Sequence, residues 1–180
     1  GQIVVHTSGR HGADVLEPAT LLGALPLALH PVMTFTGSAV DLERLGGAMF
    51  GVTAPEPLWP IAAALVVEMG AEPILIAEQD RTLYHAALAH GANHLVTLVN
   101  DAMDLLRHAG VAEPDRTLAP LLSAALDNVL RQGDAALTGP VARGDASTVE
   151  EHVAAIEGIA PETVAAYVAL ARRTATRALA

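Results

Sequence analysis

The stretch from Pro73 to Leu98, "PILIAEQDRTLYHAALAHGANHLVTL", contains the point at which the character of the sequence changes. Its first residues, Pro73 to Ala77, form a short apolar run that is typical of a buried strand. A helical pattern then runs from Arg81 to Ala109, with Asp80 as its N-cap and Gly110 at its end. Because no strand pattern follows, we predict an α/β region before residue 80 and an all-helical region after it.

Three further strands are predicted upstream of this point. They are the apolar runs Gln2 to His6, Leu25 to Leu29 and Ala48 to Thr53. Helical spacing from Pro57 to Met69 precedes the fourth strand, and Gly12 to Leu22 indicates a short helix or an irregular crossover. Strands that alternate with helices favour a parallel or mixed sheet. A buried first strand would leave an unpaired edge, so we expect that the chain lacks an N-terminal half-domain.

The downstream region shows helical patterns only. They cover Thr117 to Gln132, Thr148 to Glu157 and Glu162 to Leu179, and they are bounded by glycine and proline. We therefore predict two domains, an α/β domain over residues 1–80 and a helical domain over residues 81–180.

Composition excludes several classes of function. The net charge of −10 disfavours binding to the phosphates of nucleic acids. The chain has no cysteine, which excludes disulfides and thiolate catalysis, and no lysine, which excludes Schiff-base chemistry. No apolar run of membrane-spanning length is free of proline, glycine or charge, and no signal peptide is evident. We expect a soluble, cytoplasmic protein that does not contact a membrane.

The predicted long helix has an unusual polar face. His85, His90, Asn93 and His94 fall on one side of it, where a solvated face would usually carry Glu, Arg and Lys. Either these side chains line a site, or they are polar groups paired within the structure. His90 and His94 have the i, i+4 spacing of two metal ligands, but no third ligand stands at a motif spacing, so we predict no metal site.

The loop from Thr138 to Thr148, "TGPVARGDAST", is the most polar segment of the chain. Ser147 and Thr148 precede two glutamates at the spacing of a capping box, which predicts that a helix starts there. Arg143 beside a helix N-terminus suits a carboxylate or a phosphate, whereas Asp145 has the option of pairing with Arg143. The alternative is a capped loop that only joins two helices.

Two other polar segments directly follow predicted strands. They are "HTSG" at His6 to Gly9 and "HPVMTF" at His30 to Phe35. Ligands of open α/β sheets bind beyond the carboxyl ends of the strands, so both segments are candidates for a binding site.

These segments, together with "YHAALAHGANHLVTL" and "ALTGPVARGDASTVEEH", resemble a bacterial family in which a Rossmann-like NAD(P)-binding domain precedes a helical domain of unknown function. Its wider relatives are the 6-phosphogluconate dehydrogenase-like reductases, including pyrroline-5-carboxylate reductase and ketopantoate reductase. The resemblance implies that residues 1–80 are the C-terminal part of the Rossmann-like domain. It also implies an NAD or NADP cofactor that is bound mostly by an absent N-terminal part, because no G-x-G-x-x-G motif occurs in this sequence.

The resemblance also suggests the roles of individual residues. Superfamily members use a lysine four residues before an asparagine on the long helix, and if Asn93 is that asparagine, Ala89 replaces the lysine. His85 is the nearest replacement as proton donor. The predicted catalytic residues are His85, His30 and Asn93. The predicted substrate-binding residues are Thr34, Thr138, Gly139, Arg143 and Asp145. The predicted cofactor-binding residues are His6, Thr7, Ser8 and Gly9.

Two functions remain open at this point. The first is an NAD(P)-dependent oxidoreductase that reduces a carbonyl or imine of a small carboxylate-bearing metabolite, and the second is a non-catalytic module for dimerisation and ligand binding. The missing lysine favours the second, and the uncharged polar cluster on the long helix favours the first. The broad apolar faces of the predicted helices, such as Leu121 to Val129, predict a homodimer.

Overall fold

A computed structural model describes residues 1–179 and shows two compact units. The first unit covers Gly1–Leu95, and the second begins at Val96, inside the long helix α4 (Arg81–His108). The first unit contains every strand of the described chain, and the rest is helical, which confirms the predicted fold class. The domain boundary near residue 80 stays a prediction, because the helix that begins there continues through the junction.

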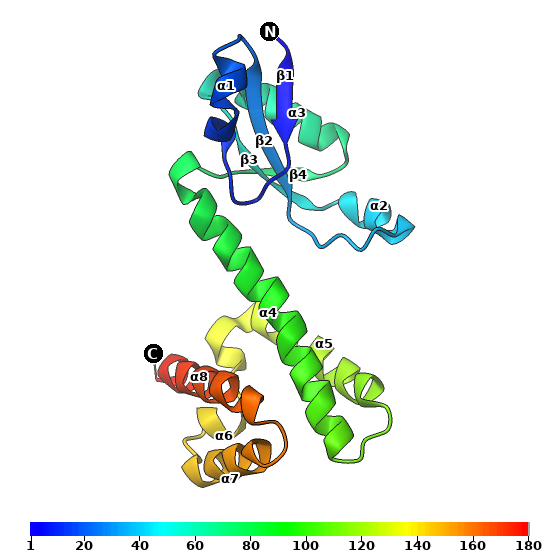
Figure 1. Ribbon diagram of the computed structural model, residues 1–180, viewed down its shortest axis with the longest axis vertical. Helices are drawn as coiled ribbons and strands as arrows, with labels where there is room; N and C mark the ends of the chain where they lie inside the picture. Colours follow the sequence, from blue (N-terminus) through cyan, green and yellow to red (C-terminus); the bar gives the residue numbers. More distant parts are fainter. Residues whose placement is uncertain (180) are drawn as a thin grey trace. The chain divides into compact units, whose positions relative to one another are not determined.

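The sheet of the first unit has four strands in the order β1-β2-β3-β4 (Figure 1). The strands are β1 (Ile3–His6), β2 (Leu25–Pro31), β3 (Met49–Thr53) and β4 (Glu72–Leu75). β1 pairs with β2 and β3 pairs with β4 in parallel, whereas β2 and β3 are antiparallel. The sheet is therefore mixed, and its two central strands carry nearly continuous buried runs, whereas β1 and β4 are half exposed.

A contiguous apolar core lies between the two central strands and helix α3 (Trp59–Glu68). Burial of these side chains removes apolar surface from water and is the main force that holds this unit together. The core residues are Leu27, Leu29, Phe50, Val52, Ala62, Val66 and Ala71.

Short helices connect the strands. η1 (Ala13–Leu16) and α1 (Glu17–Thr20) join β1 to β2, and η2 (Glu56–Leu58) precedes α3. η3 (Glu78–Asp80) leads from β4 into α4. Helix α2 (Ala39–Leu45) lies between β2 and β3 and was not predicted, although Ser38 and Asp41 form a capping box at its start.

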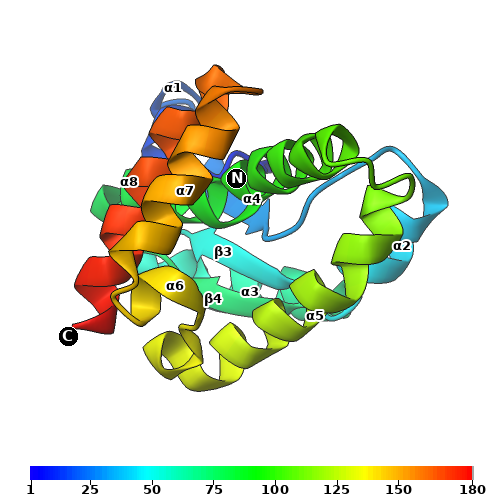
Figure 2. The same cartoon turned by 90° about the horizontal axis from the view of Figure 1, so that it is seen from below.

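The second unit contains the end of α4 and five further helical segments. They are α5 (Pro114–Gln132), η4 (Gly133–Ala136), α6 (Gly139–Ala142), α7 (Ala146–Glu157) and α8 (Pro161–Ala178). α6, α7 and α8 pack against one another, as Figure 2 shows from below. α5 begins three positions before the predicted start because Pro114 occupies its first turn, where a missing N–H costs nothing.

The predicted N-cap of α7 is wrong. Helix α7 begins at Ala146, and its N-cap is Asp145, whose carboxylate accepts hydrogen bonds from the backbone N–H and the hydroxyl of Thr148. Ser147 also donates to this carboxylate instead of capping the helix itself. Aspartate is as effective at this position as serine, and the carboxylate of Asp145 accepts from the backbone N–H of Thr148.

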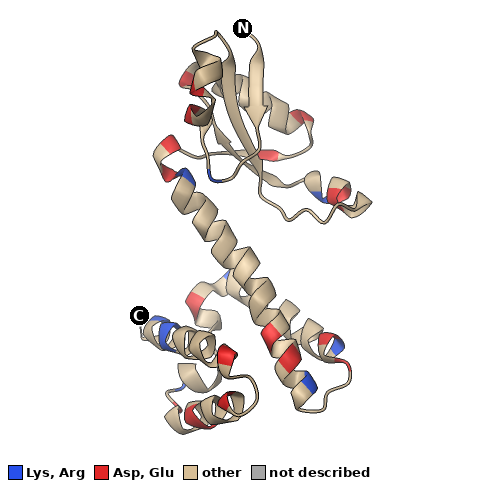
Figure 3. Ribbon diagram, viewed as in Figure 1, with Lys and Arg blue, Asp and Glu red and all other residues tan. Residues whose placement is uncertain are grey.

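The second unit buries few of its side chains. Among residues 96–179, only Pro114, Ile156 and Ala160 are buried. Figure 3 shows that α4 carries no Asp, Glu, Lys or Arg from its second residue to Asn100, so much of the helix is uncharged. None of the helices in the described chain has the length and apolar character needed to cross a membrane.

Candidate functional site

A small pocket in the first unit is lined by all three predicted catalytic residues. We call it the histidine pocket; it has a volume of about 190 Å³ and lies between the segment that ends β2 and the first half of α4. It is lined by His30, Val32, Met33, Thr34, His85, Leu88, Ala89, Ala92 and Asn93. The structure thus brings together His30, Thr34, His85 and Asn93, which come from two segments that are more than fifty residues apart.

The two histidine rings of the pocket approach each other edge to face. The ring centroids of His30 and His85 are 6.3 Å apart, and the ring planes meet at 82°. His30 is half buried at the end of β2, whereas His85 is exposed on α4. The two imidazoles therefore meet different surroundings, and their protonation is governed by different forces.

The segment His6–Gly9 lies against these rings. Gly9 is buried, and a Cβ atom placed on it would lie 2.7 Å from Nε2 of His30 and 2.7 Å from Cδ2 of His85. Such distances are too short for a side chain, so glycine is required for this approach. The predicted cofactor loop and the two predicted catalytic histidines are neighbours in space.

His6 organises this loop through both nitrogens of its ring. Nε2 is 2.7 Å from the carbonyl oxygen of Gly12, and Nδ1 accepts a hydrogen bond from the backbone N–H of Ser8. Since the Gly12 carbonyl can only accept, His6 carries its proton on Nε2. Both nitrogens of the His6 ring are occupied, and the neighbouring Thr7 is exposed.

Arg81, which the sequence analysis missed, anchors the start of α4 beneath the sheet. Its side chain is buried, and it donates to Oγ1 of Thr53 at 2.6 Å and to the carbonyl oxygens of Gly51 at 2.9 Å and Ala28 at 3.2 Å. An arginine in the first turn of a helix is usually solvated. The only feature of the sequence that sets Arg81 apart is its isolation as a charged residue, because the next Asp, Glu, Lys or Arg on this helix comes after Asn100.

Tyr84, also missed, links Arg81 to the histidine pocket. Its hydroxyl oxygen is 2.7 Å from Nδ1 of His30, and the guanidinium carbon of Arg81 lies 5.6 Å from the centre of its ring. The close approach of Tyr84 to β3 requires Gly51, because a Cβ atom there would collide with the hydroxyl.

The surroundings shift the acidity of this group of residues. Burial, the charge of Arg81 and the charge of His85 together lower the pKa of His30. Burial raises the pKa of Tyr84, although Arg81 and the backbone of Gly51 oppose the shift. Both shifts favour the uncharged form of the side chain, which is the neutral imidazole of His30 and the protonated hydroxyl of Tyr84.

The polar face of α4 beyond the pocket is exposed. His90 and His94 pair with each other through their Nδ1 atoms at 2.9 Å, and neither lines the histidine pocket. Asn93 lies on the rim of the pocket, two helical turns after His85. The two interpretations of this face therefore each apply to part of it: His85 and Asn93 line a pocket, and His90 and His94 satisfy each other.

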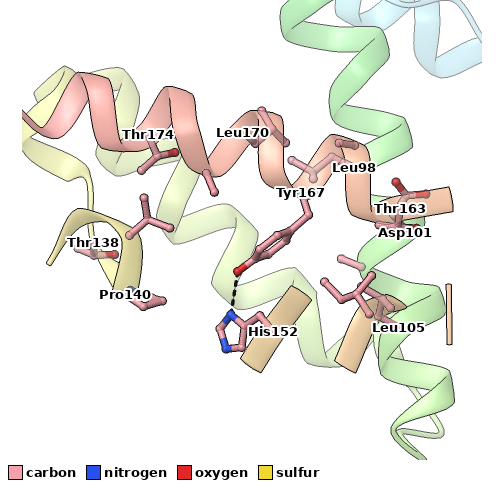
Figure 4. A pocket seen from close by; sticks show the side chains of 15 residues that line it. Leu98, Asp101, Leu105, Thr138, Pro140, His152, Thr163, Tyr167, Leu170 and Thr174 are labelled. Carbon is pink, nitrogen blue, oxygen red and sulfur yellow. Dashed lines mark hydrogen bonds between the residues drawn. The ribbon is translucent and has the colours of Figure 1, made fainter. Parts of the chain in front are cut away.

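The predicted substrate loop lies in the second unit. Thr138 and Pro140 line a pocket of about 480 Å³ together with Asp101, His152 and Tyr167 (Figure 4). The hydroxyl oxygen of Tyr167 is 2.8 Å from Nδ1 of His152. Apolar side chains from α4 and α8 form much of the remaining wall.

The remaining residues of this loop have separate structural positions. Gly139 begins α6 with a φ of 91°, a conformation that favours glycine. Arg143 ends α6, is exposed, and forms no ion pair with any residue in the described range 1–179. Asp145 caps α7 rather than pairing with Arg143, and hydrogen bonds from Thr148 and Ser147 lower its pKa.

Comparison with solved structures shows the fold. Protein TM1727 from Thermotoga maritima superposes with a TM-score of 0.80 at 24% identity, over 98% of this chain and 68% of that one. The "putative NADP oxidoreductase BF3122" from Bacteroides fragilis superposes with a TM-score of 0.78 at 21% identity, over 97% of this chain and 65% of that one. The chain thus spans about two thirds of the length of each structure. No curated protein matches the chain at a significant level.

Comparison with protein families confirms the family that the sequence resembles. The profile of a Rossmann-like domain matches residues 1–31, which contain β1, β2 and the segment His6–Gly9. The profile of the domain of unknown function DUF2520 matches residues 48–174, from β3 to α8. Since this match covers most of the sequence, the chain belongs to the DUF2520 family, with a Rossmann-like segment before it.

Proposed function

We propose that the chain is part of an NAD(P)-dependent oxidoreductase that reduces a carbonyl or imine group of a small carboxylate-bearing metabolite. The histidine pocket is the observation that carries this proposal. It places two imidazoles and one carboxamide around a small space beyond the end of β2, where ligands of α/β sheets bind. Imidazole is the side chain best suited to proton transfer near neutral pH.

Each predicted residue of the pocket has a distinct proposed role. His85 is exposed and able to exchange protons with water, so we assign it as the proton donor. His30 is the second catalytic group and faces Gly9. The carboxamide of Asn93 orients the oxygen or nitrogen that receives the proton, and the hydroxyl of Thr34 binds the substrate at the rim.

The segment His6–Gly9 fits one edge of a nicotinamide site. A reduced nicotinamide dinucleotide supplies the hydride for such a reaction. Gly9 places no side chain between the loop and the two histidine rings, while His6 holds the loop by its bonds to Gly12 and Ser8. Because the sequence lacks the glycine-rich fingerprint, we assign the dinucleotide phosphates to a part of the protein outside this chain.

We assign the substrate carboxylate to Arg143. Its exposed guanidinium has no ion-pair partner in the described part of the chain, and an arginine fork matches a carboxylate. Thr138 and Gly139 shape the turn before it, and Asp145 keeps the turn after it in place by capping α7. Direct contacts of Thr138, Gly139 and Asp145 with substrate stay predictions.

We further propose that the protein is a homodimer joined through its second unit. This unit exposes many large apolar side chains on α4, α5 and α8 and in the turn before α8. A solvated monomer tolerates few surfaces of this kind, and a second copy would cover them symmetrically. The exposed side chains are Val96, Leu98, Leu121, Leu126, Val129, Leu130, Ile159 and Leu170.

The lack of cysteine is compatible with a reducing cytoplasm, where we place the reaction.

The alternative function is a non-catalytic module for dimerisation and ligand binding. The absence of lysine favours this alternative. Ala89 stands at the position where superfamily members have the lysine, and the sequence has no other lysine. Under this alternative the histidine pocket binds a ligand but changes no bond.

Consumption of NADPH or NADH by the full-length protein, measured with a panel of 2-oxo acids and cyclic imines, separates the two functions. We expect turnover with at least one compound, and a rate about 10²- to 10⁴-fold lower for His85→Gln, the usual range for loss of a general acid. The matched control is His90→Gln, which changes an exposed histidine of the same helix outside the pocket. Cofactor binding without turnover for every compound would favour the alternative.

A further inference from the structure

The hydroxyl group of each of the two tyrosines of the chain is hydrogen-bonded to Nδ1 of a histidine. Tyr84 and His30 form one pair in the first unit, and Tyr167 and His152 form the other in the second unit. The pairs differ in their surroundings. The first pair is partly buried and lies beside the buried guanidinium of Arg81, whereas the second is exposed.

The direction of the Tyr84–His30 hydrogen bond follows from the available partners. Within the described range 1–179, the side-chain hydrogen bond of the Tyr84 hydroxyl is the one to Nδ1 of His30, at 2.7 Å. If Nδ1 carried a proton and donated it, the hydroxyl proton of Tyr84 would have no acceptor within the protein. An unpaired donor in a partly buried position is costly, so the hydroxyl donates and Nδ1 accepts.

The proton of a neutral His30 then belongs on the other nitrogen. Nε2 is the atom that faces Gly9 and the neighbouring ring of His85. The nearby charged and titratable groups all favour a neutral ring: Arg81 and Tyr84 lie behind it, and His85 lies beside it. The backbone segment packed against it contributes only Gly9, and His6 is turned toward Gly12.

We propose that Tyr84, backed by Arg81, holds His30 as the neutral tautomer with its proton on Nε2, so that the histidine pocket selects a ligand atom with a lone pair. Tyr84 and Arg81 are positioning residues in this account. The proposal rests on the proposed function and narrows its substrate class.

The protonated nitrogen of His30 limits the class of substrate through the hydrogen bond that it can form. An N–H group on His30 can donate to a carbonyl oxygen or to a neutral imine nitrogen. A protonated iminium has no lone pair and is itself a donor, so the same N–H would oppose it at close range. In the opposite tautomer Nε2 has no proton. It would accept a hydrogen bond from an iminium N–H, but it could not donate one to a carbonyl oxygen. The structure therefore favours carbonyl compounds over protonated imines as ligands of this pocket.

The pH behaviour has a defined sign. Burial, Arg81 and His85 lower the pKa of His30 below the value it has in an unfolded chain, which is about 6.5. Above about pH 6.5 the ring is neutral in both the folded and the unfolded chain, so the stability of the fold does not depend on the titration of His30. As pH falls below about 6.5 the unfolded chain binds the proton first, and the stability contributed by this site decreases. The lowered pKa favours the neutral ring of His30 in the folded chain.

Nitrogen NMR of the protein labelled with ¹⁵N-histidine reads the tautomer without any ligand. The His30 signals are identified as those lost in His30→Gln. From about pH 7 to about pH 8 we expect a protonated Nε2 and an unprotonated Nδ1 at His30. A protonated Nδ1, or a charged His30 ring at about pH 7, overturns the proposal from the wild-type spectrum alone.

Two phenylalanine variants provide the matched comparison. Tyr84→Phe removes the donor to His30 and should give averaged nitrogen shifts for an exchanging pair of tautomers. Tyr167→Phe removes the corresponding hydroxyl from His152 and should leave His30 unchanged. An unchanged His30 tautomer in folded Tyr84→Phe would show that Tyr84 does not set it.

Turnover measurements separate this proposal from the proposed function. We expect Tyr84→Phe to lose preference for 2-oxo acids over cyclic imines that are protonated at the pH of the assay, with a larger effect on kcat than on KM. The fixed tautomer combined with no turnover of any compound would reject the reductase and leave the assignment of His30 intact. Turnover by a protein whose His30 has the other tautomer would do the reverse.

Discussion

The two units of the chain differ in how they bury apolar side chains. In the first unit a sheet and one helix enclose a continuous core in which Leu27, Val52 and Val66 are almost completely buried. In the second unit, Ile156 and Ala160 are the only buried apolar residues apart from Pro114 among the described positions, while Leu130 is 78% exposed. The comparison shows that the first unit has a continuous apolar core, whereas the second buries few apolar side chains.

The largest effect is expected from a change in the core of the first unit. Phe50→Ala removes a ring that is 3% exposed and should lower the free energy of unfolding by about 3–5 kcal/mol. Urea denaturation at several protein concentrations measures it. Leu130→Ala is the control in the second unit, and in a dilute monomer it should change the free energy by less than about 0.5 kcal/mol. Equal losses for the two variants would contradict the comparison.

The contact between Gly9 and the histidine pair gives the next effect. Gly9→Ala places a methyl group where Nε2 of His30 already lies, so the loop or the rings must move at a cost of about 1–3 kcal/mol. Thermal denaturation and the NADPH assay report the two consequences. Gly46→Ala is the control, because its nearest neighbour would be 3.7 Å away and its φ is −63°. An unaffected Gly9→Ala would show that the approach of this loop to the pocket is not required.

We predict that a second copy of the chain covers the exposed apolar side chains of the second unit. Leu130→Glu adds a charge to an exposed apolar position on α5 and should raise the dimer dissociation constant at least about tenfold, or about 1.4 kcal/mol. Sedimentation equilibrium at micromolar concentration measures the constant. Leu22→Glu, at a position in the first unit that is 90% exposed, should leave it unchanged. A wild-type monomer under these conditions would reject the dimer.

A smaller effect of opposite sign is expected within α4. Gly91 lies inside this helix, and a Cβ atom placed on it would meet nothing within 4 Å in the chain. Gly91→Ala should therefore stabilise the protein by roughly 0.5–1 kcal/mol through helix propensity. Destabilisation in a thermal melt would mean that another molecule packs closely against this turn, and the uncovered surface would then extend into the first unit.

Local patterns predicted most elements of the fold. The four strands and the four long helices lie where apolar periodicity and the flanking glycines and prolines place them. The start of α7 was predicted two residues late, because the prediction relied on Ser147 and Thr148, whereas Asp145 caps the helix. Helix α2 was missed because it is short and its apolar residues show no extended period.

The site was predictable in part. The segments after β1 and β2 and the polar face of α4 indicated His30, Thr34, His85 and Asn93, which share one pocket. The support beneath them was not predictable, because Arg81 and Tyr84 act through bonds to Gly51, Thr53 and His30, which are distant in sequence. The engagement of both His6 nitrogens with nearby backbone also depends on the path of the loop, which no spacing rule describes.

Whether the histidine pocket is the ligand site is tested most directly by histidine NMR during titration of the full-length protein with NADPH and then with a mixture of 2-oxo acids. The reductase account predicts that the ring signals of His30 and His85 shift on saturation, while those of His90 and His94 stay in place, because only the first pair lines the pocket. His152 in the second unit provides an internal comparison, since its pocket has no proposed part in proton transfer. Shifts at His152 alone, or unchanged signals from His30 and His85 at saturating NADPH and 2-oxo acids, would contradict the account.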